Sequence, residues 1–240
     1  HDYNITANDA FKPVCKYWDR VTRQEQLMTA AINAMRVLTD PAETGAVALC
    51  LPQDVQGEVH DYPVEFLEKR IHHIQRRSIE QSALKRAVEM IAKSKKPLIV
   101  CGGGVKYADA ANELREFAEA FRIPFAETQA GKGAVLWDCP FNMGGIGTTG
   151  TSAANRLALE ADLVIGIGTR LNDFHTSSKW QYQNPDLKVL SINLNAMDAY
   201  KMNGVPILAD AKMALKSIAS ELGRLGYLSG YHGEIEKERA

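Results

Sequence analysis

Asp162-Leu-Val-Ile-Gly-Ile167 runs directly into Gly168-Thr-Arg170, an order of residues typical of a buried strand that ends in a sharp turn. The apolar run is too short to span a membrane and does not alternate with polar residues, so it predicts a strand covered on both faces. Apolar residues at helical spacing precede it from about Ser152. A helix that leads into a continuous apolar strand favours a parallel sheet.

The same alternation of helix and strand extends outward from this strand. Further strands are predicted at 98–101, 124–128, 187–192 and 205–208, and helices at about 78–94, 110–121, 152–161 and 211–222. Ser78 is expected to cap the first of these helices. Because single helices join successive strands, the sequence predicts an α/β domain over 78–225, with a parallel sheet and helices on both of its faces.

The regions outside this domain are too small or too polar to form a second complete one. Residues 1–62 supply only one predicted helix and one apolar strand, 46–51, so we expect them to be the C-terminal part of an earlier α/β domain. Residues 63–77 are polar and are expected to be a linker. Residues 226–240 are polar and charged and are expected to be a linker to a further domain. We therefore expect an internal piece of a longer protein.

The composition excludes several classes of protein. Hydrophobic residues make up 45% and charged residues 24%, which excludes a disordered or fibrous chain. The net charge is −1 without a basic stripe, which argues against a nucleic-acid partner, and no apolar run is long enough for a membrane span. The four cysteines are far apart and form no C-x-x-C motif, so we expect free thiols in a reducing, cytoplasmic compartment.

Glycine-bearing turns follow three of the predicted strands: Gly102-Gly103-Gly104, Gly131-Lys132-Gly133 and Gly166-Ile-Gly168. Ligands of open parallel sheets bind beyond the carboxyl ends of the strands, where glycine allows backbone amides to approach a phosphate. Glycine is also the residue that any sharp turn tolerates, so both interpretations stay open. The candidate cofactor-binding residues are Gly102, Gly103, Gly104, Gly168, Thr169 and Arg170.

Other motifs do not have the context that their chemistry needs. Gly145-Ile-Gly147-Thr-Thr-Gly150 matches the dinucleotide motif, but no strand is predicted before it, and Asp162 opens a strand instead of ending one. We expect a loop that leads into a helix N-terminus. His175 follows a strand end and could be functional or merely exposed, and it has no visible nucleophile partner. No metal site is predicted.

Three stretches occur in a recognisable order: an apolar strand before Pro52-Gln-Asp-Val55, a strand before Gly102-Gly-Gly104, and the run 160–170. This succession resembles the thiamine-diphosphate enzymes of the acetohydroxyacid synthase type over nearly the whole chain. The stretches 8–14, 17–23, 127–132 and 168–179 resemble one branch more closely. Members of that branch open the ring of a cyclic dione in myo-inositol breakdown.

The resemblance implies the central domain of a homo-oligomeric enzyme, a dimer or tetramer, with a small-molecule substrate. Thiamine diphosphate and Mg²⁺ would act as cofactors, the thiazolium serving as electron sink while a ring C–C bond breaks, and water would complete hydrolysis to a 5-deoxy-glucuronic acid. Family members hold Mg²⁺ with a Gly-Asp-Gly motif, which does not occur here. The resemblance therefore implies no catalytic residue in this fragment, and we expect the chain alone to be inactive.

Two residues of this chain are expected to lie near the substrate. Gln129 and Lys132 follow a predicted strand and are candidates to lie near the substrate, where Lys132 could neutralise developing enolate charge. The alternative, that Lys132 is simply solvated, stays open.

In the synthases an acidic residue follows the strand that ends at Ile192, whereas Asn193 and Asn195 stand here, which argues against FAD. An acetolactate-synthase-like carboligase, a nucleotide-binding module and a non-catalytic oligomerisation core remain alternatives.

Overall fold

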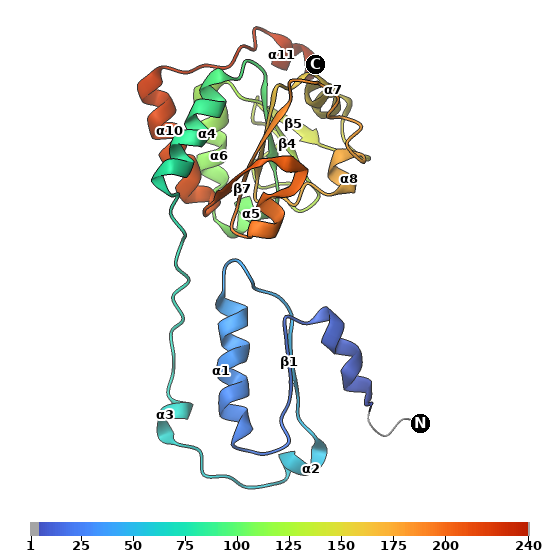
Figure 1. The fold of residues 1–240 in the computed structure, drawn as a ribbon, viewed down its shortest axis with the longest axis vertical. Coiled ribbons are helices and arrows are strands. Elements are labelled where there is room, and N and C mark those ends of the chain that lie inside the picture. The colour runs from blue at the N-terminus through green and yellow to red at the C-terminus, as the bar shows by residue number, and fades with distance from the viewer. Residues whose placement is uncertain (1–4, 240) are drawn as a thin grey trace. The chain divides into compact units, whose positions relative to one another are not determined.

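The chain divides into two compact units, His1–Gln75 and Arg76–Ala240 (Figure 1). The computed structural model describes residues 5–239, so residues 1–4 and 240 of the expected ranges 1–62 and 226–240 lie outside the described part. The division falls within 63–77, the stretch that we expected as a linker.

The first unit contains a parallel two-stranded sheet formed by β1 (Tyr17–Arg20) and β2 (Val47–Cys50). The helix α1 (Gln26–Thr39) joins the two strands. A 3₁₀ helix, Ala7–Val14, precedes the sheet, and the short helices α2 (Gln53–Gln56) and α3 (Val64–Leu67) follow it. On α1 only Ala30, Ala34 and Val37 are buried, so the core of this unit is small.

The second unit is built on a six-stranded parallel sheet with the order β5-β4-β3-β6-β7-β8, which confirms the predicted α/β class. Its strands are β3 (Pro97–Cys101), β4 (Phe125–Glu127), β5 (Asn142–Gly145), β6 (Leu163–Ile167), β7 (Lys188–Asn193) and β8 (Val205–Leu208). Apolar side chains alternate between the two faces: Ile99 and Cys101 of β3 enter one core cluster, whereas Leu98 and Val100 enter the other.

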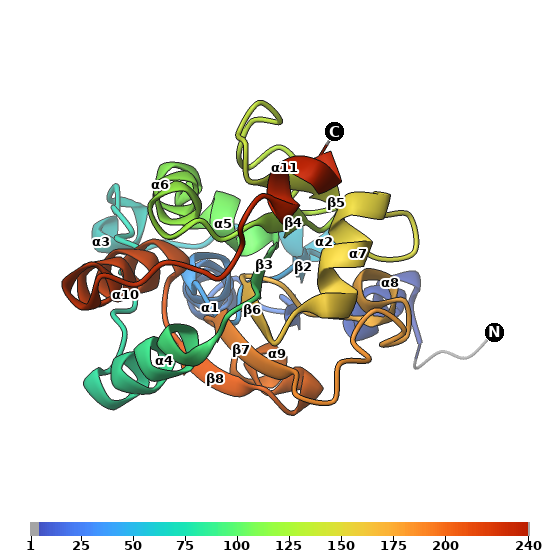
Figure 2. The same cartoon turned by 90° about the horizontal axis from the view of Figure 1, so that it is seen from above.

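Helices cover both faces of this sheet (Figure 2). The cluster on one face includes buried residues of α4, α6 and α10, and the cluster on the other includes those of α7. The helices and 3₁₀ turn of this unit are α4 (Gln81–Lys93), α5 (Gly103–Tyr107), α6 (Ala111–Phe121), α7 (Ser152–Glu160), α8 (Asp173–Thr176), α9 (Ala196–Ala199), the 3₁₀ turn Lys201–Asn203, α10 (Ala211–Leu225) and α11 (Glu234–Arg239).

The cap of α4 differs from the sequence prediction. The cap is Glu80 and not Ser78, because the Glu80 carboxylate accepts hydrogen bonds from the backbone N–H groups of Ser82 and Ala83. A carboxylate at this position also interacts favourably with the helix dipole. The prediction therefore placed the helix start too early.

Residues after α10 pack against the rest of the second unit. Tyr231 and Ile235 are buried in the same core cluster as α7. Arg239 donates hydrogen bonds to the carbonyl groups of Trp137 and Cys139. The four cysteines are free thiols, as predicted. Over residues 5–239, no helix combines the length and the apolar character that crossing a membrane would take.

Candidate functional site at the carboxyl edge of the sheet

The strand order reverses between β3 and β6, which lie side by side at the centre of the sheet. From β3 the chain proceeds outward through β4 and β5, and from β6 it proceeds in the other direction through β7 and β8. Open α/β sheets bind ligands in the crevice outside the strand carboxyl ends at such a reversal. The turns 102–104 and 168–170 both leave the sheet at this point.

The glycines of these turns allow one backbone to pack directly on another. Gly102 N donates to Ile167 O over 2.9 Å and Gly104 N donates to Gly168 O over 3.0 Å. A Cβ atom on Gly102 would lie 2.2 Å from Gly168 O, and one on Gly131 would lie 2.2 Å from Cys101 O. Close packing of one backbone on another therefore explains why glycine stands at positions 102 and 131. The backbone N–H groups of Gly102 and Gly104 are already hydrogen-bonded within the protein.

The residues after Gly168 differ in exposure. Thr169 is buried, its Oγ1 accepts from Leu171 N, and its carbonyl accepts from Asn193 Nδ2 over 3.1 Å. Arg170 is exposed. Of the candidate cofactor-binding residues, Gly102, Gly104 and Gly168 thus lie against one another, whereas Arg170 faces solvent. Binding of a ligand by this group stays a prediction.

The turn 128–133 carries both candidate substrate-proximal residues. Gln129 and Lys132 are exposed. Lys132 N donates to Thr128 O over 2.8 Å, and Gly131 N donates to Thr128 Oγ1 over 3.2 Å. The bond at Gly131 and its close approach to Cys101 place this turn beside the turn that follows β3. The structure therefore brings Lys132 to the same edge of the sheet as the central turns.

Glu127, at the end of β4, is a buried carboxylate at this edge that sequence reasoning did not single out. Its Oε1 accepts from Gly133 N over 3.1 Å. Burial raises the pKa of Glu127, while its hydrogen bonds with Gly133 and Asn142 and the charges of Lys132 and Lys106 oppose that rise. Its neighbour across the sheet is Cys101, and burial raises the pKa of that thiol to about 12. The feature of the sequence that points to Glu127 is an acidic residue inside the predicted strand 124–128.

The prediction that no strand precedes Gly145-Ile-Gly147-Thr-Thr-Gly150 is wrong, because β5 ends at Gly145. This edge strand contains two glycines and pairs irregularly with β4, so its sequence lacks the usual apolar signal. The loop does lead into the N-terminus of α7, which Thr151 caps. Asp162 lies at the opposite edge of the sheet, where it accepts from Lys95 N and Lys96 N, so it cannot hold a ribose here.

His175 lies in α8 and is half-buried. Its Nδ1 is buried and has no hydrogen-bond partner within the described residues. Burial, together with the charge of Arg170, lowers the pKa of His175. The turn at Gly147 packs on the same helix, because Thr148 N donates to Phe174 O over 3.1 Å. The 145–150 loop thus packs on the backbone of α8 at Phe174 and His175.

A family model described as "Thiamine pyrophosphate enzyme, central domain" matches residues 84–218. The chain belongs to this family. The matched range begins in α4 and ends in α10, so it contains the six-stranded sheet and its carboxyl edge. For this central domain the fold shown by the structure and the family expected from the sequence agree.

Curated relatives and a solved structure extend this match. The chain is 56% identical over 239 residues to the 3D-(3,5/4)-trihydroxycyclohexane-1,2-dione hydrolase of Clostridium tetani, covering 100% of this chain and 37% of the relative. It is 57% identical over 235 residues to the hydrolase of the same name from Bacillus cereus (strain AH820), covering 98% of this chain and 36% of the relative. The chain, whose residues 84–218 form this central domain, therefore spans little more than a third of the length of these relatives.

A structure from Mycobacterium smegmatis, described as a candidate thiamin diphosphate-dependent enzyme, is similar with a TM-score of 0.70. It is 21% identical, and the match covers 90% of this chain and 41% of the other. At that identity the likeness shows the fold alone.

Proposed function

We propose that this chain is part of a hydrolase that opens the ring of trihydroxycyclohexane-1,2-dione to a 5-deoxy-glucuronic acid in myo-inositol breakdown. The observation that carries the proposal is the identity of 56–57% over 98–100% of this chain with proteins of that name. The family match supports the same class of enzyme. Both of these relatives carry the hydrolase name, which favours the hydrolase over the carboligase alternative.

Thiamine diphosphate would supply the electron sink for cleavage of the C–C bond in such an enzyme. The residues of this chain do not fit its magnesium site: the sequence has no Gly-Asp-Gly, and residues 5–239 contain no group of three or more His, Cys, Asp or Glu side chains that could hold a metal ion. We therefore propose that both cofactors are bound by other parts of the protein.

The part that this chain would play is electrostatic and positional. The proposed substrate is a polar, uncharged ring, and cleavage of its C–C bond builds negative charge on oxygen. Lys132 is an exposed cation at the carboxyl edge, and Gln129 on the same turn offers an amide donor. A cation aimed at developing oxyanion charge lowers the barrier selectively. We assign these two residues to the substrate side of the domain.

We further propose a cytoplasmic homo-oligomer, a dimer or tetramer. The free thiols support a reducing compartment. Apolar side chains of α1 such as Ile32 and Leu38 are 48% exposed each, which supports their burial against another surface in the assembled enzyme.

The deciding experiment assays the full-length protein with thiamine diphosphate and Mg²⁺. We expect ring opening of trihydroxycyclohexane-1,2-dione and no condensation of two pyruvate molecules. Pyruvate condensation without ring opening would favour the carboligase. No turnover of either substrate by folded, cofactor-loaded enzyme would contradict both assignments.

A further inference from the structure

The peptide group between Lys132 and Gly133 is bonded at both of its poles by charged side chains. Lys106 Nζ donates to Lys132 O over 2.5 Å. Gly133 N donates to Glu127 Oε1 over 3.1 Å. The ammonium thus meets the negative pole of the peptide dipole and the carboxylate meets the positive pole. Hydrogen bonds to ionised groups are stronger than those between neutral groups.

Packing does not hold this peptide group in place. Gly133 has a φ of +75°, and no atom lies within 4 Å of the position that a Cβ would occupy on it. Gly133 and Lys132 are both exposed. A glycine with free space around it has many accessible backbone conformations. Backbone hydrogen bonds from Lys132 N to Thr128 O and from Ala134 N to Gly131 O close the turn on either side of this peptide. The peptide's own carbonyl and N–H groups are bonded by Lys106 and Glu127, which therefore favour one orientation of it.

The two side chains come from separate elements of the carboxyl edge. Glu127 ends β4 and is only 7% exposed, so its position is set by the sheet. Lys106 lies in α5, directly after the glycine turn of β3, and is exposed. The pair therefore ties the turn 128–133 to the end of β4, which it follows, and to α5, which follows the neighbouring strand β3.

We propose that Glu127 and Lys106 are positioning residues that orient the Lys132–Gly133 peptide and thereby hold the Lys132 side chain toward the substrate side of the sheet. The catalytic consequence rests on the proposed function. The orientation of the peptide does not, because it concerns bonds within this chain.

The first test measures solvent exchange of the Gly133 amide by NMR in the 240-residue chain. We expect Glu127→Leu and Lys106→Met each to accelerate exchange about tenfold, the effect of losing one bond to a charged group. Glu127→Gln retains an oxygen acceptor and should change the rate less. Glu89→Gln and Lys85→Met, exposed on α4, are the matched controls. If Glu127→Leu does not fold, Lys106→Met decides the result, because Lys106 is exposed. An unchanged rate in folded Lys106→Met overturns the proposal.

The second test measures kinetics of the full-length enzyme. If Lys106 acts through Lys132, Lys106→Met should lower kcat with little change in KM, Lys106→Arg should restore kcat, and Lys106→Met should cost nothing further in a Lys132→Met background. Additive losses would overturn action through Lys132. A normal kcat for Lys132→Met, with faster Gly133 exchange in Lys106→Met, would refute the catalytic role and leave the peptide orientation established.

Discussion

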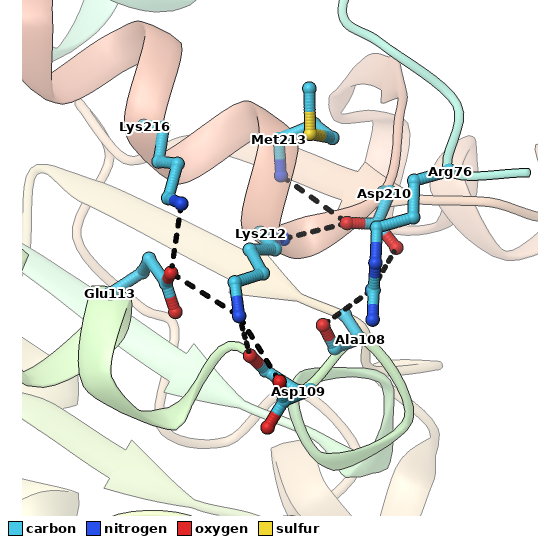
Figure 3. A network of polar contacts seen from close by, with 8 residues as sticks. All are labelled: Arg76, Ala108, Asp109, Glu113, Asp210, Lys212, Met213 and Lys216. Atoms are coloured by element: carbon cyan, nitrogen blue, oxygen red, sulfur yellow. Dashed lines mark hydrogen bonds and ion pairs between the residues drawn. The ribbon is translucent and has the colours of Figure 1, made fainter.

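Arg76 and Asp210 form an ion pair, with 3.0 Å between Nη1 and Oδ2, although 134 positions separate them in the chain (Figure 3). Arg76 Nη1 also donates to Ala108 O over 2.5 Å. Asp210 is buried and caps α10, accepting from Lys212 N and Met213 N. The first residue of the second unit is thus fixed to the start of its last long helix.

We expect Arg76→Met to lower the free energy of unfolding by about 1–2 kcal/mol, because Asp210 keeps its backbone donors but loses its cation. Arg77→Met is the matched control, since Asp210 N bonds the Arg77 carbonyl and not its side chain. Urea unfolding followed by circular dichroism measures the difference. Equal stabilities of the two variants would contradict a stabilising role for the ion pair.

Gly102→Ala is expected to destabilise the second unit by about 2–3 kcal/mol or to prevent folding, because its Cβ would lie 2.2 Å from Gly168 O. Gly223→Ala, in α10, meets no atom within 4 Å and should stabilise the helix by about 0.5–1 kcal/mol. Thermal melts of the two variants should shift in opposite directions. A Gly102→Ala melt at or above the wild-type temperature would be inconsistent with backbone-on-backbone packing at the strand-order reversal.

His175 should make stability dependent on pH. Because its pKa is lowered in the folded state, the unfolded chain binds more protons, and stability should fall as pH is lowered through about 6.5, the ordinary pKa of histidine. His175→Gln should flatten this part of the profile. Urea midpoints between pH 5 and pH 8 test the difference. Parallel profiles for wild type and His175→Gln would exclude His175 as the source.

Lys132→Met in the full-length enzyme should lower turnover by about 10²-fold, which corresponds to about 3 kcal/mol for one lost electrostatic donor. Stability should change by less than about 1 kcal/mol, because the charge is exposed. Lys85→Met should leave turnover unchanged. Near-normal turnover in Lys132→Met would establish the alternative of a solvated lysine.

FAD should bind with a dissociation constant weaker than about 1 μM, the equivalent of −8 kcal/mol. The Asn193 side chain at the end of β7 is engaged within the protein, donating to Thr169 O and accepting from Asn195 N over 3.1 Å each. An asparagine at this position has no carboxylate to bind a ribose, and its amide group is already hydrogen-bonded within the protein. Calorimetry on the 240-residue chain tests this, and a tighter constant would contradict the prediction.

The fold could be predicted from the sequence where burial determines which residues a strand contains. β6 is apolar because both of its faces are covered, so Leu163–Ile167 was predicted to within a residue. β5 was missed because an edge strand with two glycines lacks that pattern. The position of Gln129 and Lys132 on a strand-end turn was predictable from strand order along the chain. The bonds of Glu127 and Lys106 to one peptide group were not, because they depend on which strands are neighbours in the sheet.

The reversal of strand order at β3 and β6 also affects how the second unit folds. The centre of the sheet pairs Pro97 with Leu163, so the middle of the domain closes only after β4, β5 and α7 have been made. A chain still growing on the ribosome would leave one edge of the apolar strand β3 without its partner strand during that interval. Unpaired edges of this kind recruit strands from other chains. Truncations that end before Leu163 should therefore aggregate, whereas chains that include β6 gain the strand that protects this edge.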